Sequence, residues 1–110
     1  MIKTDLQLSH PELACGRWAA MPFSSQMGNI GSEVSRAVNN KLRGNLERMT
    51  NAAYRAIELF ELSIDCNSDS RTRLRELCRD KEEFCEYIFG ENAFNTNPQR
   101  LVRYYDQFVG

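Results

Sequence analysis

The sequence predicts an all-α protein, an antiparallel helical bundle of three long helices and one or two short helices. Apolar residues recur at helical spacing, cap and stop residues separate the periodic segments, and no alternating segment of strand length is bounded by turns. A chain of 110 residues is long enough for one hydrophobic core. We therefore expect a flexible N-terminal arm over residues 1–10 and a single helical-bundle domain over residues 11–110.

The first two helices are separated by proline. Pro11, favoured at the first helical position, is expected to open a short helix through ELACGRWAAM that ends at Pro22. A long helix over residues 26–43 follows, with Ser24 or Ser25 as its N-cap. Its apolar stripe is the clearest in the chain and contains Met27, Ile30, Val34, Ala37, Val38 and Leu42.

Two more long helices are expected, over residues 45–64 and 70–89. Gly44 can take the left-handed conformation that ends one helix, and Asn45 can cap the next. The helix over residues 45–64 is apolar around much of its circumference, so we expect it to be central. Asn97 and Pro98 then form the start of a last short helix.

Composition excludes several classes of function. No apolar run approaches the about 20 residues of a membrane span, and the first residues lack the apolar core of a secretory signal, so we expect a cytoplasmic protein and no membrane partner. The formal net charge of -1 provides no general attraction for nucleic acid, which would need a local basic patch.

The cysteines are expected to be reduced and free of metal. Cys78 and Cys85 stand two turns apart on one helix, about 10 Å, which is too far for a disulfide between them. No CxxC pair occurs and His10 is the one histidine, so a zinc site is not indicated. We predict no metal and no cofactor.

Two glycines interrupt the helix over residues 26–43, although each costs about 1 kcal/mol relative to alanine. Gly28 and Gly31 lie beside the apolar stripe. One interpretation is a notch where another backbone approaches closely, and the other is a groove for a ligand or partner chain. We favour the notch, which predicts that Gly31→Leu destabilises the protein.

A polar stripe occupies the same helix, because Asn29, Ser32, Glu33 and Arg36 follow the i, i+3, i+4, i+7 spacing. The ordinary interpretation is a solvated face with a Glu33 to Arg36 ion pair. The functional alternative is a cleft shared with the next helix. The candidates for ligand or partner binding are Asn29, Ser32, Glu33, Arg36, Arg55, Glu58 and Arg73.

The last short helix carries three aromatic residues within one turn, Tyr104, Tyr105 and Phe108. They either dock on the core of the same chain or form an interface with a second copy. We keep them as candidate interface residues of a homodimer or of a complex with a second protein.

Several segments resemble a family of small uncharacterised prokaryotic helical proteins. They are QMGNIGSEVSRA, GN, AYRAIELFELSI, RLREL, YIFGEN and YYDQF, and the resemblance covers residues 18–108. It implies an all-helical fold and no particular activity. More loosely, the bundle and its RAIELFELSI helix are similar to the HEPN group and to the helical partners of minimal nucleotidyltransferases.

The resemblance to HEPN proteins transfers no catalytic residue. Many of them are ribonucleases with an arginine followed by a histidine on a late helix, whereas His10 precedes every long helix here. An acid or base could come only from Glu33, Glu58, Asp65 or Glu76, each near an arginine expected to pair with it. We therefore predict no catalytic residues, and enzymatic activity is not indicated.

Two functions are compatible with these patterns. The first is a cytoplasmic helical-bundle protein that acts by protein–protein interaction or regulation as a homodimer. The alternative is a HEPN-like protein that binds nucleotide or RNA through Arg36, Arg55 and Arg73. Arginines that converge on one cleft favour the alternative, and scattered arginines favour the first function.

Overall fold

The protein is an all-α bundle, as the sequence predicts. The computed structural model describes residues 11–108, with side chains from residue 16 onward, and within them no strand occurs. The predicted arm over residues 1–10 lies outside this range. The elements are α1 (Pro11–Ala20), α2 (Phe23–Leu42), α3 (Leu46–Cys66), α4 (Arg71–Phe89), α5 (Pro98–Tyr104) and the 3-10 helix η1 (Tyr105–Phe108).

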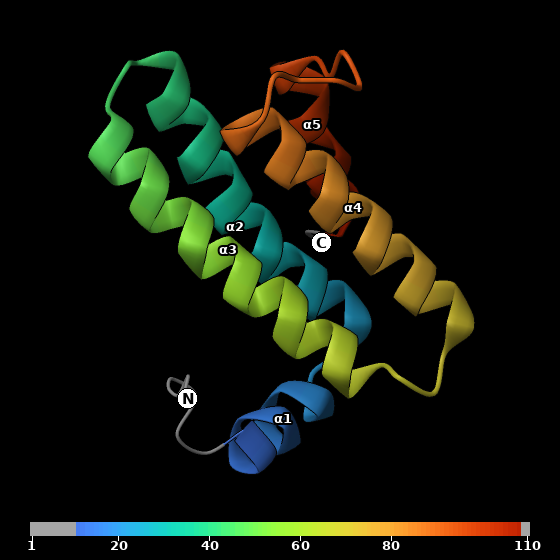
Figure 1. The fold of residues 1–110 in the computed structure, drawn as a ribbon. Coiled ribbons are helices and arrows are strands. Elements are labelled where there is room, and N and C mark those ends of the chain that lie inside the picture. Colours follow the sequence, from blue (N-terminus) through green and yellow to red (C-terminus); the bar gives the residue numbers. More distant parts are fainter. Residues whose placement is uncertain (1–10, 109–110) are drawn as a thin grey trace.

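The three long helices α2, α3 and α4 run alternately up and down, so α2 and α4 end at the same end of the bundle (Figure 1). We call this end, where the α2–α3 turn and the α4–α5 loop lie, the upper end. From there α5 and η1 return along α2 and α4, while α1 lies at the opposite end against α3. The α3 helix contacts α1, α2 and α4, but α2 also receives the C-terminal elements. The centre of the bundle is therefore shared by α2 and α3.

Side-chain caps begin three of the described helices, and the two predicted by residue, Asn45 and Asn97, are confirmed. The side chains of Asn45, Ser70 and Asn97 each accept a hydrogen bond from the backbone N–H three residues later. The predicted serine cap of α2 is wrong: the helix begins at Phe23, and the carbonyl of Pro22 accepts the first helical bonds. Proline at this position fixes an extended entry, and the helix starts without a side-chain cap.

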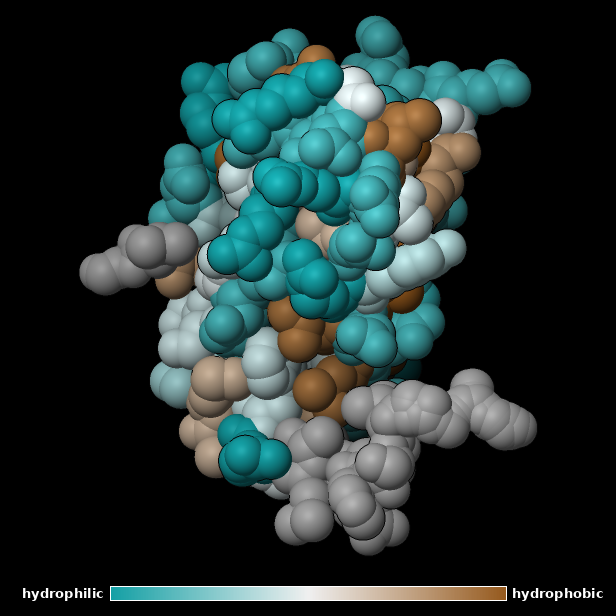
Figure 2. All heavy atoms as spheres, turned by 90° about the vertical axis from the view of Figure 1, so that its left-hand side faces the viewer, coloured by the Kyte–Doolittle hydropathy of each residue, from teal (hydrophilic) through white to brown (hydrophobic). Residues whose placement is uncertain are grey.

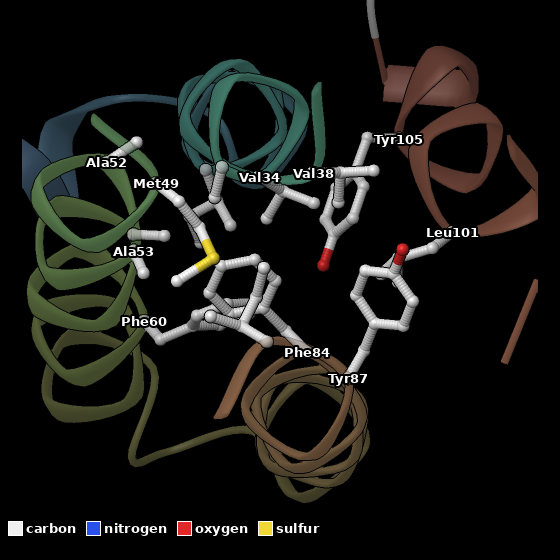
Figure 3. Packing of buried hydrophobic residues seen from close by; sticks show 14 of the residues in the cluster. Val34, Val38, Met49, Ala52, Ala53, Phe60, Phe84, Tyr87, Leu101 and Tyr105 are labelled. Carbon is white, nitrogen blue, oxygen red and sulfur yellow. The ribbon is translucent and has the colours of Figure 1, made fainter. Parts of the chain in front are cut away.

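The hydrophobic core lies between α2, α3, α4 and η1 (Figure 3). Alanines dominate the α2-facing side of α3, at Ala52, Ala53 and Ala56, so these two helices pack closely. Phe60 of α3 and Phe84 of α4 fill the wider space opposite, with ring centroids 6.1 Å apart. Burying two such rings contributes about 3–6 kcal/mol to folding.

A polar cluster holds α1 at the lower end. The indole of Trp18 donates to the Ser63 hydroxyl at 2.7 Å, and the Gln26 amide donates to the Trp18 carbonyl at 3.0 Å. The Asn67 amide donates in turn to Gln26 at 2.9 Å and to the Ser63 carbonyl at 2.8 Å. We call Trp18, Gln26, Ser63 and Asn67 the lower polar cluster.

The cysteines differ from the prediction at one position. Cys66, at the end of α3, is disulfide-bonded, so the expectation that all cysteines are reduced is wrong there. Cys78 and Cys85 are free thiols, and burial raises the pKa of the Cys85 thiol. Spacing along the chain could exclude a bond between these two, but it gave no signal for a disulfide at Cys66.

Candidate functional site

The glycine notch is filled by the C-terminal segment of the same chain. A Cβ atom built on Gly31 would lie 2.5 Å from the Cβ of Tyr105, closer than real Cβ contacts. A Cβ on Gly28 would lie 3.8 Å from the Phe108 carbonyl oxygen, an ordinary contact. Gly31 therefore allows η1 to dock on α2, which confirms a packing role, with a 3-10 helix as the partner.

The predicted polar stripe is a surface network. Asn29 and Ser32 donate to carbonyls of their own helix, those of Ser25 and Gly28. The Glu33 carboxylate accepts from Arg36 at 3.1 Å and from Arg55 of α3 at 3.2 Å. The arginine side chains are 63% and 53% exposed, so each pair contributes only about 0.2–1 kcal/mol.

The remaining binding candidates, Glu58 and Arg73, lie apart from this network. Glu58 is exposed and forms no ion pair with a described residue. The Arg73 guanidinium stands 5.0 Å from the centre of the Phe23 ring and donates to Asn67 at 3.4 Å, near the lower polar cluster. The three candidate arginines are thus divided between two places rather than gathered in one cleft.

The three aromatic candidates of the C-terminus pack on the body of the chain. Tyr105 is buried against Gly31, and Phe108 meets the Phe23 ring edge to face with centroids 6.4 Å apart. Tyr104 and Phe108 are half-buried. Docking within the chain is the alternative that the sequence left open, and their role in an interface stays a prediction.

Tyr104 forms a site that sequence reasoning missed. Its hydroxyl contacts two carboxylates of α4, those of Glu76 and of Asp80, the latter at 2.7 Å. A phenol carries one proton, so it donates to one carboxylate at a time and the other contact is favourable only when that carboxyl is protonated. The expectation that Glu76 pairs with an arginine is wrong, because Tyr104 occupies that position.

Desolvation dominates the electrostatics of this seam between α4 and the C-terminal segment. Burial raises the pKa of Asp80 to about 6, and the nearby Glu76 carboxylate acts in the same direction, while the Tyr104 bond and Arg79 oppose it. Burial also raises the pKa of Tyr104 and of Tyr105 well above the ordinary value. The Tyr105 hydroxyl points into the core (Figure 3) and has no hydrogen-bond partner among the described residues.

A pocket of about 390 Å³ opens beside this seam, between α4, the α4–α5 loop and α5. Its walls combine two arginines, two acids, amides and two apolar side chains. The lining residues are Arg79, Asp80, Glu83, Phe94, Asn95, Thr96, Asn97, Arg100, Leu101 and Tyr104.

A second feature is the gathering of exposed hydrophobic side chains at the upper end of the bundle. All large hydrophobic residues that the described part of the chain exposes lie at or near this end. We define them as the apolar end surface: Leu42, Leu46, Tyr54, Phe89 and Phe94. Figure 2, viewed from the α3 side, shows hydrophobic side chains at this end interrupted by hydrophilic ones, and further hydrophobic side chains lower on the same face.

The apolar end surface is built on rigid contacts between helices. The rings of Tyr54 and Phe89 stack across α3 and α4 with centroids 6.1 Å apart. Beneath them, the Lys41 ammonium of α2 donates to the Tyr87 carbonyl and lies 4.4 Å from the centre of the Tyr87 ring. A lysine that satisfies the last carbonyls of α4 fixes the ends of α2 and α4 relative to each other.

The described residues contain no helix long and apolar enough to cross a membrane. The same part of the chain contains no group of three or more His, Cys, Asp or Glu side chains arranged to hold a metal ion. Comparison with models of known families, with curated proteins and with solved structures gives no match. The function is therefore argued from the geometry of the site.

Proposed function

We propose that the protein acts by protein–protein interaction as a homodimer, with the apolar end surface as its interface. The observation that carries this proposal is the clustering of exposed hydrophobic residues at one end of the bundle. Single exposed hydrophobic residues are common, but here Tyr54 stacks on Phe89 and Phe89 shares a hollow with Phe94, and adjoining exposed hydrophobic residues mark an interaction surface. Aromatic residues such as Tyr54, Phe89 and Phe94 are also the types enriched in interfaces.

Charge favours a second copy as the occupant. Arg43 and Arg48 adjoin Leu42 and Leu46 in the α2–α3 turn, where Glu47 is the one acid, and Glu82 lines a hollow with Phe89 and Phe94. A two-fold axis brings each side of one copy against the opposite side of its mate. The net charge of -1 opposes such pairing only weakly.

The arginines support this function over the nucleotide-binding or RNA-binding alternative. Arg36 and Arg55 share Glu33, whereas Arg73 lies with Phe23 at the lower end. An anion site needs guanidinium groups that converge on one ligand. Binding of RNA that is weakened when these three arginines are replaced would favour the alternative.

The cytoplasmic location belongs to the same proposal. The disulfide at Cys66 weighs against it, since disulfides are more typical of oxidising compartments. Rapid alkylation of free thiols during isolation of the protein from cells, followed by identification of the modified cysteines, distinguishes a reducing from an oxidising environment. Modification of Cys66 would support the cytoplasm, and its protection would contradict it.

Sedimentation equilibrium tests the dimer. We expect a dimer at micromolar concentration and a monomer for Phe89→Asp, because a charge in the centre of the interface must be desolvated without a partner. Ser68→Asp, an exposed position at the lower end, is the matched control and should remain dimeric. A monomeric wild-type chain, or a dimer that Phe89→Asp leaves intact, would contradict the proposal.

A further inference from the structure

The pocket between α4 and α5 has the size of a small-molecule site. Its volume of about 390 Å³ lies within the range of about 300–1,000 Å³ that is common for such sites. It is separate from the polar stripe of α2 and from the notch at Gly31.

Two arginines give the pocket its positive side. Arg79 of α4 and Arg100 of α5 both line it, and neither forms an ion pair or a side-chain hydrogen bond with a described residue. The Arg36 and Arg55 side chains, by contrast, are both held by Glu33. Guanidinium groups without a protein partner in a common hollow favour a carboxylate as ligand.

Two acids give the pocket its negative side. Asp80 accepts from the Tyr104 hydroxyl at 2.7 Å, and Glu83 accepts from the Thr96 hydroxyl at 2.9 Å. Both donors are neutral, and neither acid has a cation within ion-pair distance among the described residues. Asp80 is only 5% exposed, so its ionised form has little water around it, and Arg79 is the one cation in the described part of the chain that acts on it, from beyond ion-pair distance. A ligand ammonium would supply a closer positive charge.

The four charges sum to zero, and an apolar wall adjoins them. Phe94, 55% exposed, and Leu101 of α5 both line the pocket. A polyanion would be repelled by Asp80 and Glu83, and a simple amine would be repelled by the arginines. A zwitterion with an apolar group matches all three walls.

We propose that this pocket binds a free α-amino acid with an aromatic or large aliphatic side chain. The carboxylate lies against Arg79 and Arg100, the ammonium against Asp80 and Glu83, and the side chain against Phe94. The charged residues of this site lie outside the apolar end surface, but Phe94 belongs to both. The site is therefore tested on a monomeric chain, in which no second copy covers Phe94.

Three probes that share a phenyl group test the proposal: L-phenylalanine, phenethylamine without the carboxylate, and 3-phenylpropionate without the ammonium. We expect saturable backbone amide shifts of residues 79–101 with L-phenylalanine in heteronuclear NMR at pH 7. Each of the other probes should bind about tenfold more weakly or less, because one charged contact is missing. Titration of a monomeric Phe89→Asp chain separates failure of this site from failure of the dimer.

Variants assign the binding to the pocket. Arg100→Gln and Asp80→Asn should each weaken L-phenylalanine binding by about tenfold. Arg103→Gln, on the same helix but lining a different hollow with Val38 and Leu42, is the matched control and should bind as the wild type does. No saturable shift with L-phenylalanine up to about 10 mM, equal binding of 3-phenylpropionate, or an effect of Arg103→Gln as large as that of Arg100→Gln would overturn the proposal.

Discussion

The lower polar cluster and the seam between α4 and the C-terminal segment both bury polar groups, but only the first pairs all of them. In the lower polar cluster, donors meet acceptors one to one, as between Trp18 and Ser63. In the seam, the Tyr104 hydroxyl contacts two carboxylates and the Tyr105 hydroxyl meets no described partner. Buried polar groups that are all hydrogen-bonded help to specify a fold, whereas unpaired ones are expected at functional or strained sites.

The two regions also differ in how they are packed. The lower cluster joins α1, α2 and α3 through side-chain bonds. The C-terminal segment that forms one side of the seam docks on α2 at Gly31, where the Tyr105 side chain leaves no room for a Cβ atom. The seam is therefore where a single substitution should have the largest effect.

The largest effect is expected for Gly31→Leu. A leucine side chain starts from a Cβ that is already 2.5 Å from the Tyr105 Cβ, so η1 must move away from α2. The free energy of unfolding should fall by about 3 kcal/mol or more, the upper range for overpacking, as measured by chemical denaturation.

Gly28→Ala is the matched control for Gly31→Leu. Its Cβ would make an ordinary contact at 3.8 Å, so alanine should stabilise α2 by up to about 1 kcal/mol through helix propensity. A denaturation midpoint that rises in Gly31→Leu would show that η1 does not dock at this glycine.

A smaller effect is expected from the titration of Asp80. Its pKa rises from 3.8 in the unfolded chain to about 6 in the folded protein. The folded state therefore holds more protons than the unfolded state between these values, and stability falls as pH rises through them. If the whole rise in pKa were converted to free energy, the protein would lose about 3 kcal/mol of stability. Partial solvent screening reduces the expected loss of stability to about 1–2 kcal/mol.

Asp80→Asn should remove this pH dependence. The amide oxygen can still accept from Tyr104, while the desolvated charge is gone. We expect the variant to be more stable than the wild type by about 1–2 kcal/mol at pH 7 and nearly equal to it at pH 4. Urea denaturation across this range measures the difference, and an unchanged slope would assign the dependence to other groups.

The helices and the notch could be predicted because their signals are local. Asn45 and Asn97 cap helices three residues away, and Gly31 stands beside its own apolar stripe. The seam could not be predicted, because Tyr104 meets Glu76 and Asp80 across 28 and 24 residues of chain. The one usable signal was the spacing of Glu76 and Asp80, which places two carboxylates on one face of α4.

The apolar end surface was missed for a related reason. Leu42 belongs to the predicted apolar stripe, yet it is 56% exposed, and Leu46 across the turn is 64% exposed. Periodicity identifies the face of a helix but not how far the neighbouring helices extend along it. Both leucines lie at the α2–α3 turn, beyond the reach of α4.

The smallest effect, and the most direct test of the comparison, comes from removing one hydroxyl in each region. Tyr105→Phe deletes a buried hydroxyl that has no partner among the described residues, so the desolvation cost disappears and the free energy of unfolding should rise by about 1 kcal/mol. Ser63→Ala deletes a hydroxyl of similar burial that accepts from Trp18, so it should lower the same quantity by about 1 kcal/mol or more. Denaturation curves measured in parallel should show the free energy of unfolding changing in opposite directions. One substitution removes an unpaired polar group, and the other creates one. If Tyr105→Phe destabilised the protein as much as Ser63→Ala, the Tyr105 hydroxyl would be hydrogen-bonded in solution, and the seam would be as fully paired as the lower polar cluster.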